Sequence, residues 1–395
     1  MKENRLIIAA AGSGKTTYLV KNAKIQTGRV LITTFTNENE SEIREKFVEL
    51  YGCVPSHVTI KAWFSFLLQH GVRPYQGTFN DRLYDYRITG VNLVNAQSGI
   101  KYYRTFGKKK IPVLYTEQDD FLKCYFDDDN RVFTDKIARF VCHANEISKG
   151  KVIKRISAIY PMIYIDEVQD LAGYDLEFLN LLFRSSSTVL CVGDPRQATF
   201  YTHWEKKYST YKHGKIREFV ENECRKKDHV VIDTETLMNS HRNNKSICDF
   251  SSSLYPDLPK STPCSCEDCH SKSVEHQGIY LVKKEDINRY IQLFQPVQLR
   301  YNKKVKICPS APCCNFGNSK GKTFNRVLIY PTQDIKRWLK DRSFVLEETT
   351  KARLYVAITR ARYSVAFVAD TKDCSEISDI PVWTEQVHSE SHLTT

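Results

Sequence analysis

The sequence contains no apolar run long enough to cross a bilayer. The longest apolar stretch near its start, residues 6–11, leads into Gly12 and then a lysine instead of a signal-peptide cleavage site. These features predict a cytoplasmic protein with no membrane partner. Glycine and proline are also scarce, at 16 and 13 of 395 residues, which excludes collagen-like and low-complexity chains.

Acidic residues are outnumbered by basic ones. The chain has 58 Lys and Arg against 46 Asp and Glu, so its formal net charge is +12. A surplus of this size favours a polyanionic partner. With 41% hydrophobic and 26% charged residues, the composition excludes a fully disordered chain, and the length is sufficient for two or three domains.

The 13 cysteines are expected to be free thiols without a disulfide framework. Six of them crowd into one region: Cys264, Cys266, Cys269, Cys308, Cys313 and Cys314. The first three cysteines are followed by His270, and together these residues have ligand types and spacing compatible with a zinc site. The last three cysteines are available to complete such a site. Because no Cys-x-x-Cys pair is repeated, the sequence favours the alternative of reduced thiols in a polar loop.

Short apolar runs alternate with amphipathic stretches along the chain, which is typical of parallel sheets flanked by helices. This pattern predicts an α/β fold. The first set of strands is predicted at residues 6–9, 30–33, 162–165 and 188–192, and the second at residues 278–282, 326–330 and 364–368. Between them, residues 174–183 carry the apolar periodicity of a helix.

Two stretches interrupt this alternation. Residues 71–150 are polar and rich in aromatic side chains, and we expect them to form a small subdomain inserted in the first domain; residues 256–277 are expected to form a loop. The predicted organisation is a first domain of residues 1–70 and 151–225, the insertion at 71–150, a second domain of residues 226–370, and a polar, frayed tail of residues 371–395.

A phosphate-binding loop is predicted at residues 9–16, between a predicted strand and an amphipathic helix. Small residues let backbone N–H groups surround a phosphate, while Lys15 supplies a charge for the β- and γ-phosphates of ATP and Thr16 a hydroxyl for Mg²⁺. The first position is Ala9, where the general pattern has glycine. The predicted ATP-binding residues of this segment are Ala11, Gly12, Ser13, Gly14, Lys15, Thr16 and Thr17.

Two acids, Asp166 and Glu167, follow the predicted strand at residues 162–165. They stand at its carboxyl end, where sheets of this class bind ligands. Asp166 is predicted to bind Mg²⁺ together with Thr16, and Glu167 to orient or deprotonate the attacking water. The alternative, an acidic pair that caps the next helix, is weaker because a phosphate-binding loop lies upstream.

These two motifs and five others in the same order resemble the UvrD/Rep/PcrA-like helicases of superfamily 1. The matching segments are residues 9–16, 34–37, 166–170, 192–197, 240–242, 318–324 and 354–362. The resemblance implies two RecA-like P-loop domains with parallel sheets, which clamp ATP between them while single-stranded DNA crosses both. It also implies ATP-dependent 3′-to-5′ translocation on DNA or unwinding of DNA.

The resemblance implies further residues around the nucleotide. Gln197 would sense the γ-phosphate, and Arg242 and Arg360 would stabilise charge on the transferring phosphoryl group from the second domain. With Glu167 they form the implied catalytic set. His241 and Gly321 are implied contacts of the nucleotide. Taken singly, a buried arginine is more often part of a structural ion pair.

DNA contacts are implied in and beside the same segments. Single strands are held through their backbone and by stacking of bases on aromatic rings, although most aromatic side chains belong to a protein core. The implied DNA-binding residues are Thr34, Phe35, Asn37, Trp63, Trp204, Ser319 and Lys320.

Three departures from the family pattern concern the base and the sugar of the nucleotide. No glutamine precedes the phosphate-binding loop, His241 stands where the family has tyrosine, and Thr323 stands where it has glutamate. The preference for ATP over other nucleotides therefore stays open, whereas the groups that handle the triphosphate are present.

The segment between the fourth and fifth motifs, residues 243–318, is too short for the large accessory domain of full-length helicases. Compact members of this type occur beside nucleases in antiphage operons such as Gabija, which is an analogy only. Two alternatives to a helicase are therefore kept: a DNA-stimulated ATPase that signals to a partner nuclease, and a nucleic-acid-binding clamp that ATP switches.

Overall fold

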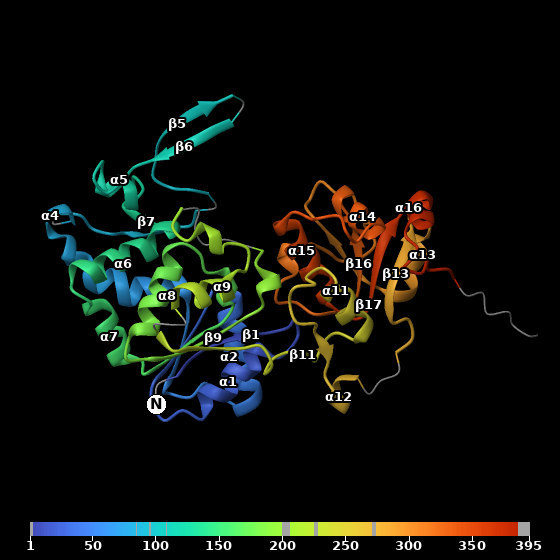
Figure 1. The fold of residues 1–395 in the computed structure, drawn as a ribbon, viewed down its shortest axis with the longest axis horizontal. Coiled ribbons are helices and arrows are strands. Elements are labelled where there is room, and N and C mark those ends of the chain that lie inside the picture. The colour runs from blue at the N-terminus through green and yellow to red at the C-terminus, as the bar shows by residue number, and fades with distance from the viewer. Residues whose placement is uncertain are drawn as a thin grey trace, which may run out of the picture. The chain divides into compact units, whose positions relative to one another are not determined.

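The structure is a computed structural model that describes residues 3–83, 85–94, 96–107, 109–199, 206–224, 228–270 and 274–385. The chain divides into two compact units (Figure 1), one of residues 1–10 and 14–238 and one of residues 11–13 and 239–395.

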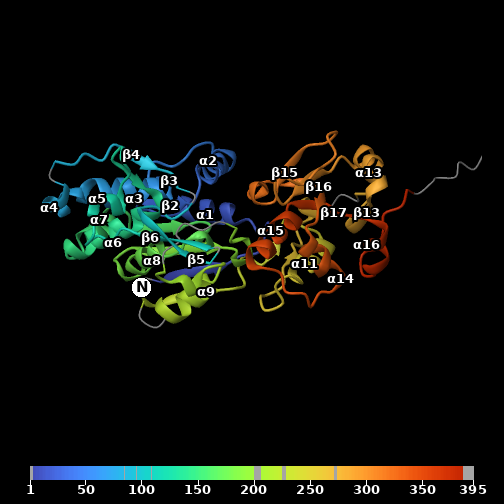
Figure 2. The same ribbon diagram turned by 90° about the horizontal axis from the view of Figure 1, so that it is seen from above.

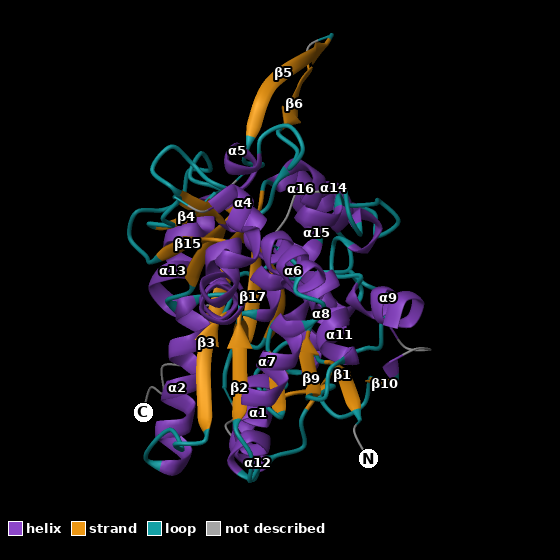
Figure 3. Ribbon diagram, turned by 90° about the vertical axis from the view of Figure 1, so that its left-hand side faces the viewer, coloured by secondary structure: helices purple, strands orange, loops and turns teal. Residues whose placement is uncertain are grey.

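The first unit is built on a parallel sheet. Within the described residues it has six strands in the order β10-β1-β9-β8-β2-β3, and every neighbouring pair is parallel. The strands are β1 (Asn4–Ile8), β2 (Val30–Thr34), β3 (Val58–Ala62), β8 (Met162–Ile165), β9 (Thr188–Gly193) and β10 (Val230–Asp233). Figure 3 shows β3, β2, β9 and β1 in this order across the sheet, with β8 between β2 and β9.

Both faces of this sheet are buried, because successive side chains of a strand point to opposite faces and here both sets are apolar. Ile7 and Ile32 join the core that α1 (Lys15–Lys24) and α2 (Asn37–Tyr51) cover. Leu6 and Ile8 join the opposite core, which is covered by a larger group of helices. That group comprises α3 (Trp63–Leu67), α6 (Ile137–Ile147), α7 (Lys151–Ile159), α8 (Tyr174–Arg184) and α9 (Ile216–Phe219).

The segment expected to form an insertion contains two small sheets and several helices. Strand β4 (Gly90–Asn92) pairs with β7 (Arg131–Phe133), and β5 (Ile100–Phe106) forms an antiparallel hairpin with β6 (Lys109–Leu114), which projects from the rest of the unit in Figure 3. The short helix α4 (Asn80–Leu83) precedes these strands in sequence, and the short helix α5 (Phe121–Tyr125) lies between β6 and β7. Helix α6 ends the segment, and its apolar residues belong to the core of the first unit.

The second unit has its own parallel sheet. Its described residues contribute five strands in the order β13-β17-β16-β14-β15, as Figure 2 shows in part. The strands are β13 (Gly278–Lys283), β14 (Val297–Arg300), β15 (Cys313–Asn315), β16 (Phe324–Tyr330) and β17 (Ala361–Ala369). A separate pair joins β11 (Asn239–Ser240) to β12 (Thr262–Pro263) in parallel, with α12 (Glu267–His270) following.

Helices also cover both faces of the second sheet. Helices α11 (Lys245–Ser252), α14 (Gln333–Lys340) and α15 (Glu348–Thr359) share one core with Leu281 and Phe367. Helix α13 (Ile287–Phe294) shares the opposite core with Val282 and Leu328. The predicted α/β class with parallel sheets is therefore confirmed, and each predicted strand and the helix predicted at residues 174–183 is present.

Two features differ from the sequence-based expectation. Residues 226–238 were assigned to the second domain, but β10 pairs with β1 in the first sheet and extends its edge. The tail from residue 371 was expected to be frayed, but it forms α16 (Thr371–Glu376), and the backbone of Trp383 donates to the Leu281 carbonyl at 2.7 Å. Both β10 and the segment around Trp383 have partners that lie far away in sequence.

No helix among the described residues has both the length and the apolar character that a transmembrane helix requires.

The packing of Trp383 in the core of the second unit can be tested by mutation. Its ring is 8% exposed and meets Tyr290 edge-to-face with ring centroids 5.2 Å apart. Trp383→Ala is expected to lower the free energy of unfolding by about 3–5 kcal/mol, because it leaves a large cavity. Leu293→Ala is the control, since Leu293 on α13 is 46% exposed and its loss is expected to cost less than about 0.5 kcal/mol. Urea denaturation measures both, and similar losses would contradict the packing of Trp383.

Candidate functional site

The loop between β1 and α1 has the backbone form that a phosphate-binding loop requires. Gly12 and Gly14 have φ values of +73° and +80°, in the left-handed region that favours glycine, and Gly14 caps the amino end of α1. At the start of the loop, Ala9 N–H donates to the Gly193 carbonyl at 2.8 Å and Ala10 N–H to the Leu237 carbonyl at 2.7 Å. The loop therefore leaves the sheet at a fixed point and leads into a helix amino end, where anions bind.

Lys15 and the acidic pair lie together at the carboxyl end of the sheet. Lys15 Nζ is 3.9 Å from Glu167 Oε1, and both side chains are nearly buried. Glu167 has a φ of +55°, which is uncommon for a residue with a side chain, and its N–H donates to Asp166 Oδ1 at 2.9 Å. The structure thus brings together three predicted site residues from two distant segments.

Asp166 has a strongly perturbed environment. Its side chain lies in the protein interior, and burial, together with the neighbouring charge of Glu167, raises its pKa to about 7, although Lys15 acts in the opposite direction. A divalent cation favours the charged form of such a carboxylate. An acidic pair beside a lysine and a phosphate-binding loop is a donor set that fits Mg²⁺ with a nucleotide, with Asp166 and the Thr16 hydroxyl as the residues available to the metal.

A buried network connects Glu167 to the segment after β9. The Gln169 side-chain amide donates to Glu167 Oε2, and its carbonyl accepts from the Asp194 N–H at 3.1 Å. Asp194 in turn accepts from Gln197 Nε2 at 2.9 Å and from Arg196 Nη1 at 3.1 Å. The sequence analysis named Glu167 and Gln197 as site residues but did not name Gln169, Asp194 or Arg196. The position of these three residues inside the same two motifs could have identified them.

In the second unit the fourth and sixth motifs are joined by hydrogen bonds. Asn243 Nδ2 donates to the carbonyls of Thr359 and Ala361 at 3.1 and 2.7 Å, and Arg242 Nη1 donates to the Thr359 carbonyl at 3.2 Å. Asn243 is a fourth residue that the sequence analysis did not identify.

Arg360 links the sixth motif to the fifth. It is 2% exposed, and its guanidinium donates to the carbonyls of Val356 at 3.1 Å and Lys322 at 3.3 Å. Gly321, beside Lys322, is exposed and has a φ of +83°. The nucleotide-facing roles of Arg242, Arg360 and Gly321 stay predictions. His241 lies with its Nδ1 atom 3.1 Å from the sulfur of Cys266.

The predicted DNA-binding residues differ in how accessible they are. Asn37 is exposed at the start of α2, Lys320 is half-buried, and Phe35 is half-buried and packs edge-to-face on Phe64 with centroids 5.6 Å apart. Thr34 and Ser319 are buried, and the Ser319 hydroxyl donates to the Phe316 carbonyl at 2.6 Å. Their side chains therefore do not face solvent. Trp204 lies outside the described residues.

Trp63 is a core residue. Its ring is 1% exposed and packs on Phe66 and Phe178, and its indole N–H donates to Asp175 Oδ1 at 2.7 Å. This burial contradicts the expected stacking of Trp63 on a DNA base, because neither ring face is accessible. The reason is that Trp63 begins α3, directly after β3, where the helix turns its apolar face to the sheet.

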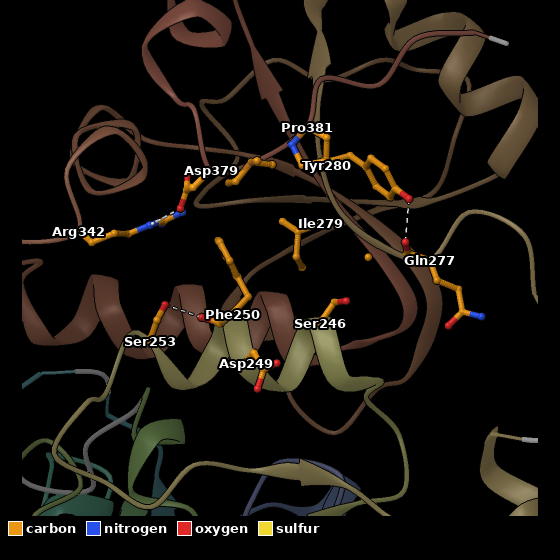
Figure 4. A pocket seen from close by; sticks show the side chains of 12 residues that line it. Ser246, Asp249, Phe250, Ser253, Gln277, Ile279, Tyr280, Arg342, Asp379 and Pro381 are labelled. Carbon is orange, nitrogen blue, oxygen red and sulfur yellow. Dashed lines mark hydrogen bonds and ion pairs between the residues drawn. The ribbon is translucent and has the colours of Figure 1, made fainter.

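A cavity of about 570 Å³ lies in the second unit, and its walls contain none of the site residues described above. Figure 4 shows it between α11 and the segment that contains Asp379 and Pro381. Its arginine and acid pair with each other, since Arg342 Nη2 is 2.8 Å from Asp379 Oδ2. None of the predicted site residues lines this cavity, so it has no part in the candidate site.

Comparison with known proteins gives one family match. Residues 1–202 match the family model described as AAA domain. No protein in a search of curated proteins matches the sequence.

Two solved structures of a viral protein were also matched. They are the arterivirus nonstructural protein 10, a helicase, alone and in complex with DNA, each with 14% sequence identity and a TM-score of 0.41 over 95% of this chain. The chain spans 62% and 63% of the lengths of those two chains.

The contact between Gly193 and Gln169 generates a test of the network. A Cβ atom at Gly193 would lie 2.3 Å from Gln169 Oε1 and 2.9 Å from Val168 Cγ1. Gly193→Ala is therefore expected to lower the free energy of unfolding by about 1–3 kcal/mol through overpacking. Gly28→Ala is the matched control, because its Cβ would meet nothing closer than Pro161 at 3.7 Å. If urea denaturation shows equal stability for the two variants, the tight contact is not real.

Proposed function

The chain belongs to the AAA domain family, and from that premise we propose that it is an ATPase that moves along single-stranded DNA in the 3′-to-5′ direction. This domain type is found in helicases of the UvrD/Rep type. The observation that carries the proposal is the approach of Lys15 to Glu167 beside the buried Asp166. We further propose ATP and Mg²⁺ as its cofactors and the cytoplasm as its location.

In this proposal, each site residue of the first unit has a separate role. Lys15 and the backbone of residues 11–16 bind the β- and γ-phosphates, and bound Mg²⁺ supplies neutralising charge to the same phosphates. Glu167 accepts the proton of the attacking water, and Gln169 fixes the direction of its carboxylate. Gln197, held by Asp194, senses whether a γ-phosphate is present.

Arg242 and Arg360 act from the second unit in this proposal. Their guanidinium groups stabilise the charge that develops on the transferring phosphoryl group. The hydrogen bonds of both side chains to main-chain carbonyls support a fixed, preorganised orientation. The surroundings of His241, next to the sulfur of Cys266, favour a role other than contact with the nucleotide.

Three observations support a single-stranded nucleic acid as the partner. The net charge of +12 favours a polyanion. Phe35 and Asn37 follow β2 at the carboxyl edge of the sheet, with Asn37 exposed. The β5–β6 hairpin carries exposed aromatic side chains, Tyr102, Tyr103 and Phe106, interspersed with Lys101, Arg104 and Lys109. Rings for stacking next to cations for phosphates are the combination that holds single strands without reading their sequence.

An ATP-switched clamp does not require a catalytic base, so the position of Glu167 favours an enzyme.

The short length of the segment 243–318 supports a motor that unwinds long duplexes poorly by itself. Among its described residues, strands β13, β14 and β15 belong to the second sheet, and the helices α11 and α13 pack on that sheet. This organisation agrees with a motor that works with a partner, of which a nuclease is one example.

The catalytic role of Glu167 is tested by separating binding from turnover. Glu167→Gln keeps the shape of the side chain but removes the base, so ATP hydrolysis is expected to fall by at least about 100-fold while ATP affinity stays nearly unchanged. Lys15→Ala is expected to lose ATP binding itself. The control is Glu49→Gln, whose side chain is 63% exposed. Phosphate release and nucleotide titration measure the two quantities, and turnover of Glu167→Gln within a few-fold of the unmodified chain would refute the assignment.

The motor activity is tested with streptavidin bound to one end of a labelled oligonucleotide. ATP hydrolysis is expected to rise with single strands of any base sequence and to weaken steeply with salt. A 3′-to-5′ motor displaces streptavidin from the 5′ end, so displacement from the 3′ end alone would refute the polarity. Displacement from neither end, with DNA-stimulated hydrolysis intact, would replace the motor by the signalling ATPase. Hydrolysis that DNA does not change would remove DNA as the partner.

A further inference from the structure

The second unit gathers three cysteines and one histidine into a compact cluster. The ligand atoms of His241, Cys264, Cys266 and Cys269 all lie within 4.8 Å of one another. The Cys266 sulfur is 2.7 Å from that of Cys264 and 3.4 Å from that of Cys269. His241 Nδ1 lies 3.1 Å from the Cys266 sulfur and 3.6 Å from the Cys269 sulfur. No other such group occurs among the residues that the structure describes.

The backbone explains why these residues meet. Strands β11 and β12 pair Asn239 with Thr262 and Ser240 with Pro263, and Cys264 N–H donates to the Ser240 carbonyl at 2.9 Å. The residues that follow the two strands, His241 and Cys264, are thereby neighbours. A tight turn then brings Cys269 back, since its N–H donates to the Cys266 carbonyl at 3.2 Å.

We propose that His241, Cys264, Cys266 and Cys269 bind one structural Zn²⁺ ion. Three thiolates and one imidazole are a common ligand set of closed, four-coordinate zinc sites. Zinc–ligand bonds of about 2.3 Å for sulfur give a tetrahedron with edges of about 3.8 Å, so small side-chain movements outward from the described positions suffice to admit the ion. The site stands independently of the proposed ATPase function.

The side chains around the cluster suit a zinc–thiolate centre that carries a net negative charge. Three thiolates with Zn²⁺ leave one negative charge. The cavity of about 440 Å³ that His241, Cys264 and Cys269 help to line also has Arg242, Lys245 and Arg362 in its wall, and these cations stabilise that charge.

The sequence-based preference for reduced thiols was reasonable, because the fourth ligand lies 25 residues before Cys266 and inside another motif. The three cysteines that were available to complete such a site do not take part in the cluster. Cys308 contacts Asn288 Oδ1 at 3.1 Å, and neither it nor Cys313 or Cys314 belongs to the described cluster. His241 instead supplies the missing ligand, and it stands where the resembling helicases have a tyrosine.

A metal at this point has a consequence for the candidate site. Arg242 follows His241 directly, its N–H donates to Ser240 Oγ at 3.3 Å, and its guanidinium reaches the Thr359 carbonyl. Zinc would hold the backbone on one side of Arg242 while Asn243 holds it on the other. The ion is therefore a brace for the segment that presents Arg242, and it takes no part in the chemistry.

Metal content tests the proposal directly on the full-length chain. Protein purified without chelator is expected to carry about one zinc ion per chain by elemental analysis. Replacing zinc with Co²⁺ is expected to give the visible absorption of a tetrahedral site and a thiolate-to-cobalt charge-transfer band. Cys266→Ser and His241→Ala are each expected to weaken zinc binding by at least about 100-fold. Cys313→Ser, an exposed cysteine of β15 outside the cluster, is the matched control and should keep its zinc.

Several outcomes would overturn the site. Zinc well below one per chain, both as purified and after incubation with equimolar Zn²⁺, would leave reduced thiols as the correct description. An intact mass two hydrogens lower, with no zinc, would indicate a disulfide instead. Equal zinc in Cys266→Ser and Cys313→Ser would place the ion elsewhere. If a variant fails to fold, the Co²⁺ spectrum of the unmodified chain still decides, because an absent charge-transfer band excludes thiolate ligands.

Discussion

Burial of both faces of each parallel sheet is the constraint on which the candidate site depends. Because apolar side chains alternate to opposite cores, as Leu6 and Ile7 do in β1, the strands have no polar face on which to carry a site. The polar side chains of the candidate site therefore lie at the strand ends. Strands β1, β2, β8 and β9 are neighbours and parallel, so the loops that follow them leave the first sheet at one edge. That edge holds Lys15, Phe35, Glu167 and Gln197.

The polar groups at this edge are costly to bury and are compensated by one another. Asp194 is 0% exposed, yet it accepts hydrogen bonds from Arg196 and Gln197. Gln169 extends the same network to Glu167, so the carboxylate direction is fixed by hydrogen bonds within the protein. The absence of a side chain at Gly193 makes room for this glutamine. A rigid arrangement of this kind holds its charges in place before a substrate arrives, which is what electrostatic catalysis requires.

The sequence predicted the fold well where the signal was local. Runs such as residues 162–165 and 188–192 are short, apolar and bounded by polar residues, and they form β8 and β9. Prediction was weaker where the outcome depended on a distant partner. The short strand β10 belongs to the first sheet only because it pairs with β1. Trp383 is a core residue because its ring packs on Tyr290 and its backbone is hydrogen-bonded to Leu281. The same limit applies to the prediction of functional residues. A tryptophan can stack on a DNA base or pack in a core, and only the contacts of Trp63 with Asp175 and Phe178 show that it is a core residue.

His241 shows how such a distant contact changes the meaning of a motif. By its place next to Arg242, the residue resembles a nucleotide contact in which tyrosine has been replaced, and such a replacement weakens stacking on a base. Beside Cys264, Cys266 and Cys269, the same replacement has a physical reason, because imidazole ligates zinc and a phenol does so poorly. A small second unit has fewer packed contacts to hold its loops. A metal ligand at His241 would supply that rigidity locally, at the segment where the proposed function requires Arg242 to keep a fixed direction.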